Sequence, residues 1–178
     1  MKKKINVWEY AGDIMNALQK GVLLTTKSGE QLNTMTISWG TLGIEWGKPI
    51  FTVFVRENRF TRTLLEENPE FTINVPYGAF DKKILGICGT KTGKTTDKIK
   101  LAGLTPEAPE TISVPAIKEL PLTLECRIIY KQAQNPNEIT EENRLKFYPQ
   151  DVDSSFHSAN CDYHTAYYGE IVSAYIIE

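Results

Sequence analysis

The stretch that decides the fold is Asn33-Thr34-Met35-Thr36-Ile37-Ser38-Trp39-Gly40. Hydroxyl and apolar side chains alternate along it, which is the two-residue period of a strand with one buried face. The hydroxyl face consists of Thr34, Thr36 and Ser38. Small hydroxyls supply donors and acceptors without bulk, so a flat ligand can approach the backbone of such a strand closely. The alternative is a half-exposed strand without a ligand, because Thr favours strands in any case.

The composition is that of an ordinary globular protein. With 178 residues, of which 41% are hydrophobic and 24% charged, we expect a single domain over residues 1–178. The net charge of −2, with no basic run beyond Lys2-Lys3-Lys4, argues against nucleic-acid binding. Polar residues and a glycine interrupt residues 5–19, so we expect neither a secretory leader nor a membrane span.

The cysteines and histidines exclude several kinds of site. Cys88, Cys126 and Cys161 are far apart and form neither a metal-binding pair nor a disulfide framework. We therefore expect reduced thiols in a cytoplasmic protein. His157 and His164 are the only histidines, too few for a histidine-built metal centre, so we expect no metal. No Gly-x-Ser-x-Gly motif is present to nominate a serine nucleophile.

The hydrophobic pattern predicts many strands and few helices. Helices are expected over residues 9–20, 58–68 and 81–88. Strands are expected over residues 22–27, 33–39, 50–55, 71–75, 112–114, 122–132, 144–148 and 165–177. Loops are expected over residues 40–49 and 151–162. The simplest architecture is a mainly β protein, a β-barrel with peripheral helices, because a closed barrel leaves no strand edge exposed.

A candidate anion site lies where the strand ending at Val55 runs into the next helix. Free backbone N–H groups at a helix N-terminus attract anions. Arg56, Arg59 and the Thr61 hydroxyl lie within this turn and can add charge-assisted hydrogen bonds to a phosphate. The alternative is that these arginines are solvated surface charges.

Residues 89–96 invite comparison with a nucleotide-binding P-loop, but the spacing excludes it. The Walker pattern requires a glycine five positions before Gly93, and Cys88 stands there. We therefore interpret this segment as a flexible basic loop.

The order of the motifs resembles the flavin reductase-like family of FMN-binding split barrels, and its flavoredoxin-type branch in particular. The segments that carry the resemblance are residues 33–40, 55–61, 71–76, 92–98, 102–105, 124–126 and 164–171. The resemblance implies a homodimer that binds FMN and passes electrons between NADH or NADPH and flavin. A carrier that holds FMN without turnover and acts with partner proteins is the alternative, and a heme- or pyridoxamine-related split barrel is a third possibility.

The same resemblance implies roles for particular residues. The flavin ring would lie against Asn33, Thr34, Met35, Thr36, Ser38 and Trp39. The ribityl phosphate would be held by Arg56, Arg59, Phe60, Thr61, Lys94 and Asp97. His164 corresponds to the family's histidine near the flavin and the nicotinamide, and its alternative is a hydrogen-bonded structural histidine. Residues 132–163 depart from the family pattern, and we expect an inserted loop or hairpin that reshapes the substrate entrance.

Overall fold

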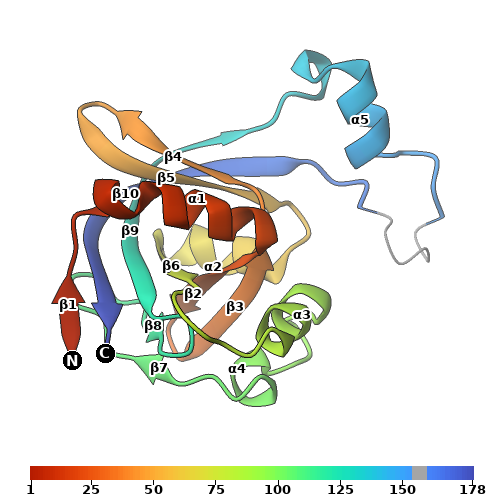
Figure 1. Cartoon of the computed structure of the whole chain (residues 1–178). Helices are drawn as coiled ribbons and strands as arrows, with labels where there is room; N and C mark the ends of the chain where they lie inside the picture. Colours follow the sequence, from red (N-terminus) through yellow and green to blue (C-terminus); the bar gives the residue numbers. More distant parts are fainter. Residues whose placement is uncertain (154–159) are drawn as a thin grey trace.

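The computed structural model describes residues 1–153 and 160–178, and its centre is one antiparallel sheet that curls round on itself (Figure 1). The strands of this sheet are β1 Lys2–Lys4, β2 Val22–Ser28, β3 Gln31–Ile37, β4 Gly40–Glu45, β5 Lys48–Arg56, β6 Glu70–Val75, β9 Leu122–Ala133 and β10 His164–Ile177. Their order is β3-β2-β6-β9-β10-β5-β4, and β1 pairs with β10. A separate two-stranded pair joins β7 (Pro106–Glu107) to β8 (Ala116–Ile117). The predicted mainly β split-barrel architecture is confirmed.

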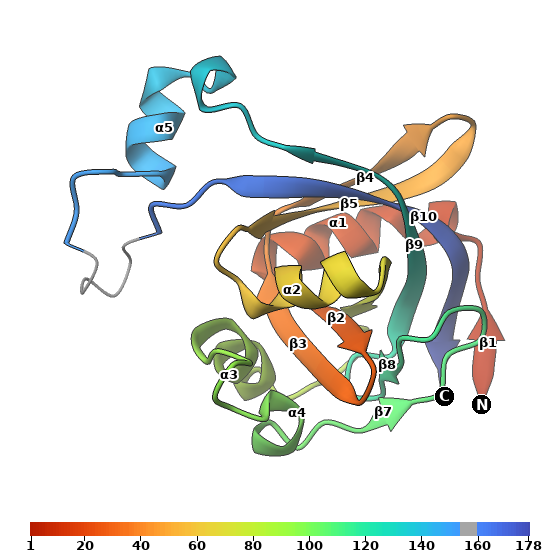
Figure 2. The same ribbon diagram turned by 180° about the vertical axis from the view of Figure 1, so that it is seen from behind.

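Helices lie at several positions around the sheet, and α5 lies away from it (Figure 2). They are η1 Val7–Tyr10, α1 Ala11–Lys20, α2 Phe60–Glu67, α3 Lys83–Thr90, α4 Lys98–Leu101, η2 Pro136–Glu138 and α5 Glu141–Phe147. None of them, within the described ranges, combines the length and apolarity that crossing a bilayer requires.

The core has two parts because β2 is buried on both faces. Ile14 and Leu18 of α1 pack with Phe51 and other inward-facing strand residues in the larger cluster. On the opposite face of β2, Leu23 packs with Ile84 of α3 in a smaller cluster. The helices α3 and α4 therefore lie against the outer side of β2 and β3.

The expected loop over residues 40–49 is wrong, because residues 40–45 form β4 in a hairpin with β5. Trp46 and Gly47 have φ values of 52° and 69°. Two successive positive φ angles are those of a tight two-residue hairpin turn, and this turn pairs Glu45 with Lys48. The first turn position is Trp46, where such turns usually have Asn, Asp or Gly, so the sequence pattern does not predict the turn.

The expected strand over residues 144–148 is also wrong, because residues 141–147 form α5. Acidic residues occupy the first turn and basic residues the last, which complements the helix dipole. With η2, this helix lies in a segment that projects away from the sheet (Figures 1 and 2). We call residues 134–153 and 160–163 the arm. Part of the expected loop over residues 151–162, and of the insertion expected over 132–163, lies outside the described residues.

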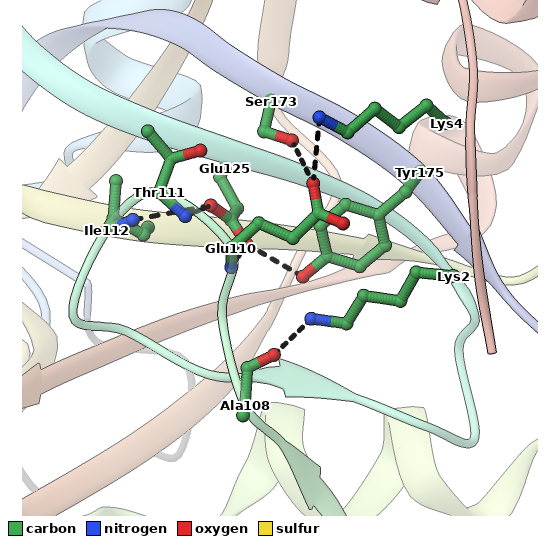
Figure 3. A network of polar contacts seen from close by, with 9 residues as sticks. All are labelled: Lys2, Lys4, Ala108, Glu110, Thr111, Ile112, Glu125, Ser173 and Tyr175. Atoms are coloured by element: carbon green, nitrogen blue, oxygen red, sulfur yellow. Dashed lines mark hydrogen bonds and ion pairs between the residues drawn. The ribbon is translucent and has the colours of Figure 1, made fainter.

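A buried carboxylate holds the loop that follows β7 (Figure 3). Glu125 of β9 accepts hydrogen bonds from the backbone N–H groups of Glu110, Thr111 and Ile112 at 2.7, 2.7 and 3.3 Å. It also accepts one from the Tyr175 hydroxyl at 2.8 Å. The loop turns its N–H groups toward this carboxylate instead of pairing as a strand, so the strand expected over 112–114 is wrong.

Replacing Glu125 by Gln should lower the free energy of unfolding by about 2–3 kcal/mol. The carboxylate has two acceptor oxygens, whereas the amide has one, and its NH2 group would face backbone N–H groups that are also donors. Urea denaturation measures the loss. Tyr175→Phe removes one donor and leaves the three N–H groups bound, so it should cost only about 1 kcal/mol. Equal losses in the two variants would contradict this account.

Candidate functional site

A cavity of about 300 Å³ opens where the end of β3, the turn before α2 and residues 88–93 meet. Most of the predicted site residues line it. They are Asn33, Met35, Thr36, Ser38, Trp39, Arg56, Arg59, Phe60, Thr61 and His164. Residues far apart in the chain, from β3 to β10, are thus brought to one place.

Thr34 is a predicted site residue that does not line the cavity. Its side chain is fully buried, where its hydroxyl donates to the Leu24 carbonyl at 3.3 Å and lies 3.0 Å from Thr25 Oγ1. Part of the hydroxyl face of β3 packs against α3, where the Thr36 hydroxyl donates to the Leu85 carbonyl at 2.7 Å. The structure therefore gives Thr34 an internal bonding role instead of a ligand contact.

Lys94 and Asp97 also lie outside the cavity lining. Lys94 is exposed, and Asp97 caps α4 by accepting from the Lys100 N–H at 3.0 Å. Two other lysines line the cavity, Lys91, which is exposed, and Lys98, which is buried. Lys98 is not among the residues expected at the site, because no local sequence pattern distinguishes it from the neighbouring lysines.

Lys98 is buried as a residue, and its ammonium has no anionic partner among the described residues. No described carboxylate forms an ion pair with it. Burial lowers the pKa of Lys98 to about 8. Cys88 opposes this shift, and the nearby Arg59 adds to it. A buried cation without a partner is costly, so its place at a cavity points to an anion as the missing group.

The rest of the lining has the same electrostatic character. Arg56, Arg59, Lys91 and Lys98 line the cavity, and no described Asp or Glu does. The N-terminus of α2 begins there, with free backbone N–H groups. The Thr61 hydroxyl accepts from Asn33 Nδ2 at 3.0 Å, which leaves its own hydrogen to donate. The polar end of the cavity is therefore suited to a phosphate.

Arg56 is expected to bind a phosphate, but its guanidinium donates hydrogen bonds to backbone carbonyls of the arm. It donates to the carbonyls of Phe147, Asn160 and Asp162 at 2.9, 2.9 and 2.6 Å. Arg59 keeps more of its side-chain donors, since its guanidinium makes one hydrogen bond to the described residues, to Asn160 Oδ1 at 3.1 Å. Arg56 thus anchors the arm beside the cavity, and Arg59 is the arginine with donors for an anion.

The turn before α2 also differs from expectation. The expected helix begins at residue 58, whereas α2 begins at Phe60 and its N-cap position, Arg59, has no side-chain cap hydrogen bond. The backbone N–H of Asn58 donates to the Asp162 carboxylate at 2.9 Å. The arm is therefore bound to this turn through main-chain and side-chain groups.

Trp39 marks the apolar end of the site. It was expected on the buried face, but β3 ends at Ile37 and the Trp39 side chain is 40% exposed. Its ring lies 5.2 Å from that of Phe147, edge to face. A second cavity of about 390 Å³ shares Ser38, Trp39 and Phe54 with the first. Its other lining residues are Met15, Leu18, Gln19, Gly40 and Gln134.

His164 is buried at the cavity wall. Its ring lies 5.1 Å from the ring of Trp39, and its Nδ1 is 2.8 Å from the Tyr148 hydroxyl. Burial lowers the pKa of His164 to about 4, and Arg56 reinforces the shift, so the imidazole is neutral at physiological pH. Within residues 1–153 and 160–178, no group of His, Cys, Asp and Glu side chains could hold a metal ion.

The buried Lys98 predicts an unusual pH dependence of stability. Its pKa is about 8 in the folded chain against an ordinary value of 10.5, so the unfolded chain binds more protons between these pH values. The contribution of Lys98 to the free energy of unfolding of the flavin-free protein should therefore rise as the pH increases from about 8 to about 10.5. Buried groups with raised pKa values, such as Cys88 and Tyr167, act in the opposite direction, but they do so equally in the wild type and in a Lys98 variant. Urea denaturation across this range measures the rise, which Lys98→Met should lack. Parallel curves for the two proteins would contradict the burial of a charged lysine.

Comparison with known proteins gives consistent matches. The family model of the flavin reductase like domain matches residues 15–178. An uncharacterized protein of Archaeoglobus fulgidus is 30% identical over 100 residues, which are 56% of this chain. An uncharacterized protein of Pyrococcus abyssi is 29% identical over 106 residues. The two alignments span 55% and 59% of the lengths of these relatives, little more than half.

Two solved structures illustrate the similarity of fold. The flavoredoxin from Methanosarcina acetivorans superposes with a TM-score of 0.64 at 25% identity, covering 89% of this chain and 68% of that one. The NADH:FAD oxidoreductase of Streptomyces globisporus C-1027 superposes with a TM-score of 0.63 at 18% identity, covering 88% and 74%. At 18% identity, the likeness to this oxidoreductase is one of fold alone.

Proposed function

The chain belongs to the flavin reductase-like family, and from this membership we propose that it is an FMN-binding oxidoreductase. In this proposal it passes electrons between NADH or NADPH and flavin, or a downstream acceptor. The observation that carries the proposal is the unpartnered Lys98 ammonium in a cavity lined by cations and by no described acid. FMN has the two parts that such a site requires, a phosphate and a flat aromatic ring.

The residues present fit each part of FMN. Lys98, Arg59 and the Thr61 hydroxyl would hold the phosphate at the N-terminus of α2. Met35 and Trp39 would contact the ring at the other end of the cavity, where the lining becomes apolar. This assignment replaces Lys94 by Lys98 and leaves Arg56 as an anchor of the arm.

When bound, FMN supplies the hydride and electron chemistry, and the protein supplies binding and orientation. No side chain of the chain needs to form a covalent bond. The neutral His164 can form a hydrogen bond with the ligand, and Arg56 holds the arm beside the site. We keep His164 as the residue beside the reacting ring.

The visible absorption spectrum tests this proposal. We expect a flavin spectrum in the purified protein or after adding FMN, and its anaerobic bleaching by NADH or NADPH. If the spectrum of added FMN were the same with and without the protein, this would contradict the proposal. FMN binding without bleaching by either nicotinamide would instead support the second candidate, an electron carrier, which the similarity to flavoredoxin favours.

We also propose that the protein is a cytoplasmic homodimer, in keeping with its three free cysteines. An apolar surface for a second copy lies on β4 and the end of β9. Ile44 and Trp46 are 70% and 59% exposed there, and the Trp46 ring lies 6.0 Å from that of Tyr130. Exposed apolar side chains of this size gathered on one face are typical of an interface.

Trp46→Glu should convert the homodimer to monomers, because it places a charge in the proposed interface. Light scattering coupled to size-exclusion chromatography gives the mass of each protein. The matched control is Leu145→Glu, which changes an exposed leucine of α5 outside this surface and should leave the dimer intact. A monomeric wild-type protein would contradict the proposed dimer.

A further inference from the structure

The arm brings two polar side chains to His164, and their hydrogen bonds form a closed set. Gln134 directly follows β9, and its backbone N–H donates to the His164 carbonyl at 2.9 Å. In return, the backbone N–H of His164 donates to Gln134 Oε1 at 3.1 Å. Because this contact needs an acceptor, the oxygen of the Gln134 amide, and not its nitrogen, faces His164.

The Tyr148 hydroxyl lies between the two residues, 2.9 Å from Gln134 Oε1 and 2.8 Å from His164 Nδ1. It has one hydrogen to donate. If that hydrogen pointed to Nδ1, the oxygens of Tyr148 and Gln134 would face each other at 2.9 Å with no hydrogen between them. If it points to Gln134 Oε1, Nδ1 carries a proton and donates to the Tyr148 oxygen, and every contact is a hydrogen bond.

We propose that Gln134 and Tyr148 are positioning residues that hold His164 in the tautomer with its proton on Nδ1. Nε2 then carries a lone pair and accepts a hydrogen bond from an N–H or O–H group of the ligand in the cavity. The identity of that ligand, a flavin or a nicotinamide, rests on the function proposed above. The tautomer itself rests on the contacts alone.

The packing around Tyr148 keeps the hydroxyl in place. Its ring stacks on that of Tyr163, with centroids 4.8 Å apart. The Arg56 guanidinium lies 5.0 Å from the ring centroid on the same tyrosine. Arg56 also donates to three carbonyls of the arm, so the contacts of Tyr163 and Arg56 hold the Tyr148 ring, and with it the hydroxyl, in place.

Burial and the charges around His164 keep its imidazole neutral, and only a neutral imidazole can have its single proton on one nitrogen or the other. Arg56 and Arg59 oppose a positive imidazole, and burial opposes it more strongly, whereas Asp162 favours it. The neutral ring with a bare Nε2 accepts a hydrogen bond and has no proton to give at that atom. His164 therefore orients a ligand donor and does not act as an acid toward it.

Nitrogen NMR of the histidine rings at pH 8 tests the proposal in the full-length, flavin-free protein. A protonated ring nitrogen and a bare one have well-separated chemical shifts, and the His157→Gln variant assigns the two histidines of the chain. We expect the His164 proton on Nδ1. Gln134→Leu removes the acceptor and frees the Tyr148 hydrogen to turn to Nδ1, so the proton should move to Nε2. Gln134→Glu keeps an acceptor oxygen and should keep the proton on Nδ1.

Two results would overturn the proposal. One is a wild-type His164 with its proton on Nε2, which decides the question even if a variant fails to fold. The other is an unchanged tautomer in a Gln134→Leu variant whose backbone amide spectrum shows a folded protein. Because no flavin is present, a failure here leaves FMN binding untouched, and an absence of FMN binding leaves the tautomer untouched.

Discussion

Lys98→Met should weaken FMN binding by about 100-fold, or about 3 kcal/mol, because it removes the buried cation opposite the phosphate. Quenching of flavin fluorescence on titration measures the affinity. The same variant should make the flavin-free protein more stable at pH 7, since a buried ammonium without a partner is costly and a thioether is not. A loss of affinity together with a gain of stability is not expected of a lysine with a purely structural role.

Lys94→Met is the matched control for Lys98. Lys94 lies four residues earlier, is exposed and does not line the cavity. We expect its FMN affinity to stay within about threefold of the wild type, because an exposed charge contributes little. A larger loss in Lys94→Met than in Lys98→Met would restore the assignment made from sequence and contradict the one made from the structure.

Gly169→Ala should lower the free energy of unfolding by about 3 kcal/mol, the largest loss of stability that we expect from adding one methyl group. Gly169 of β10 pairs with Ile128 of β9 and Phe51 of β5. An added Cβ would lie 2.5 Å from Phe71 Cζ and 2.8 Å from Cys126 Cβ, both in the buried core. The ring must move, and the core has no space to receive it.

Gly86→Ala is the control for the backbone effect of a glycine substitution. A Cβ at Gly86 meets nothing within 4 Å, and the residue lies inside α3. This variant should gain up to about 1 kcal/mol, because alanine favours helices over glycine. Chemical denaturation of the two variants under the same conditions compares them. A loss below about 1 kcal/mol for Gly169→Ala would show that β10 and Phe71 separate more easily than the packing implies.

The strands that alternate clearly were predictable, and the structure confirms them within a few residues. β6 and β9 begin and end close to the expected positions, and Gly21 ends α1 with a φ of 118°. In these elements local pattern and tertiary packing agree, so the sequence alone suffices.

The errors arise where tertiary contacts decide. Gly40 and Gly43 lower the strand propensity of β4, which exists because the turn at Trp46 pairs it with β5. Alternation placed Thr34 and Thr36 on one face of β3 but could not reveal that α3, about fifty residues later, packs against part of that face. Lys98 is a further case in which tertiary contacts decide. The composition predicts a basic segment, but which of its lysines is buried at the cavity depends on packing.

The most direct test of the central claim is to compare the binding of FMN and riboflavin to the wild-type protein, because the two differ by the phosphate. If the cavity binds FMN through Lys98 and Arg59, FMN should bind saturably and at least about tenfold more tightly than riboflavin. Equal affinities for the two flavins, or no saturable binding of FMN, would contradict it.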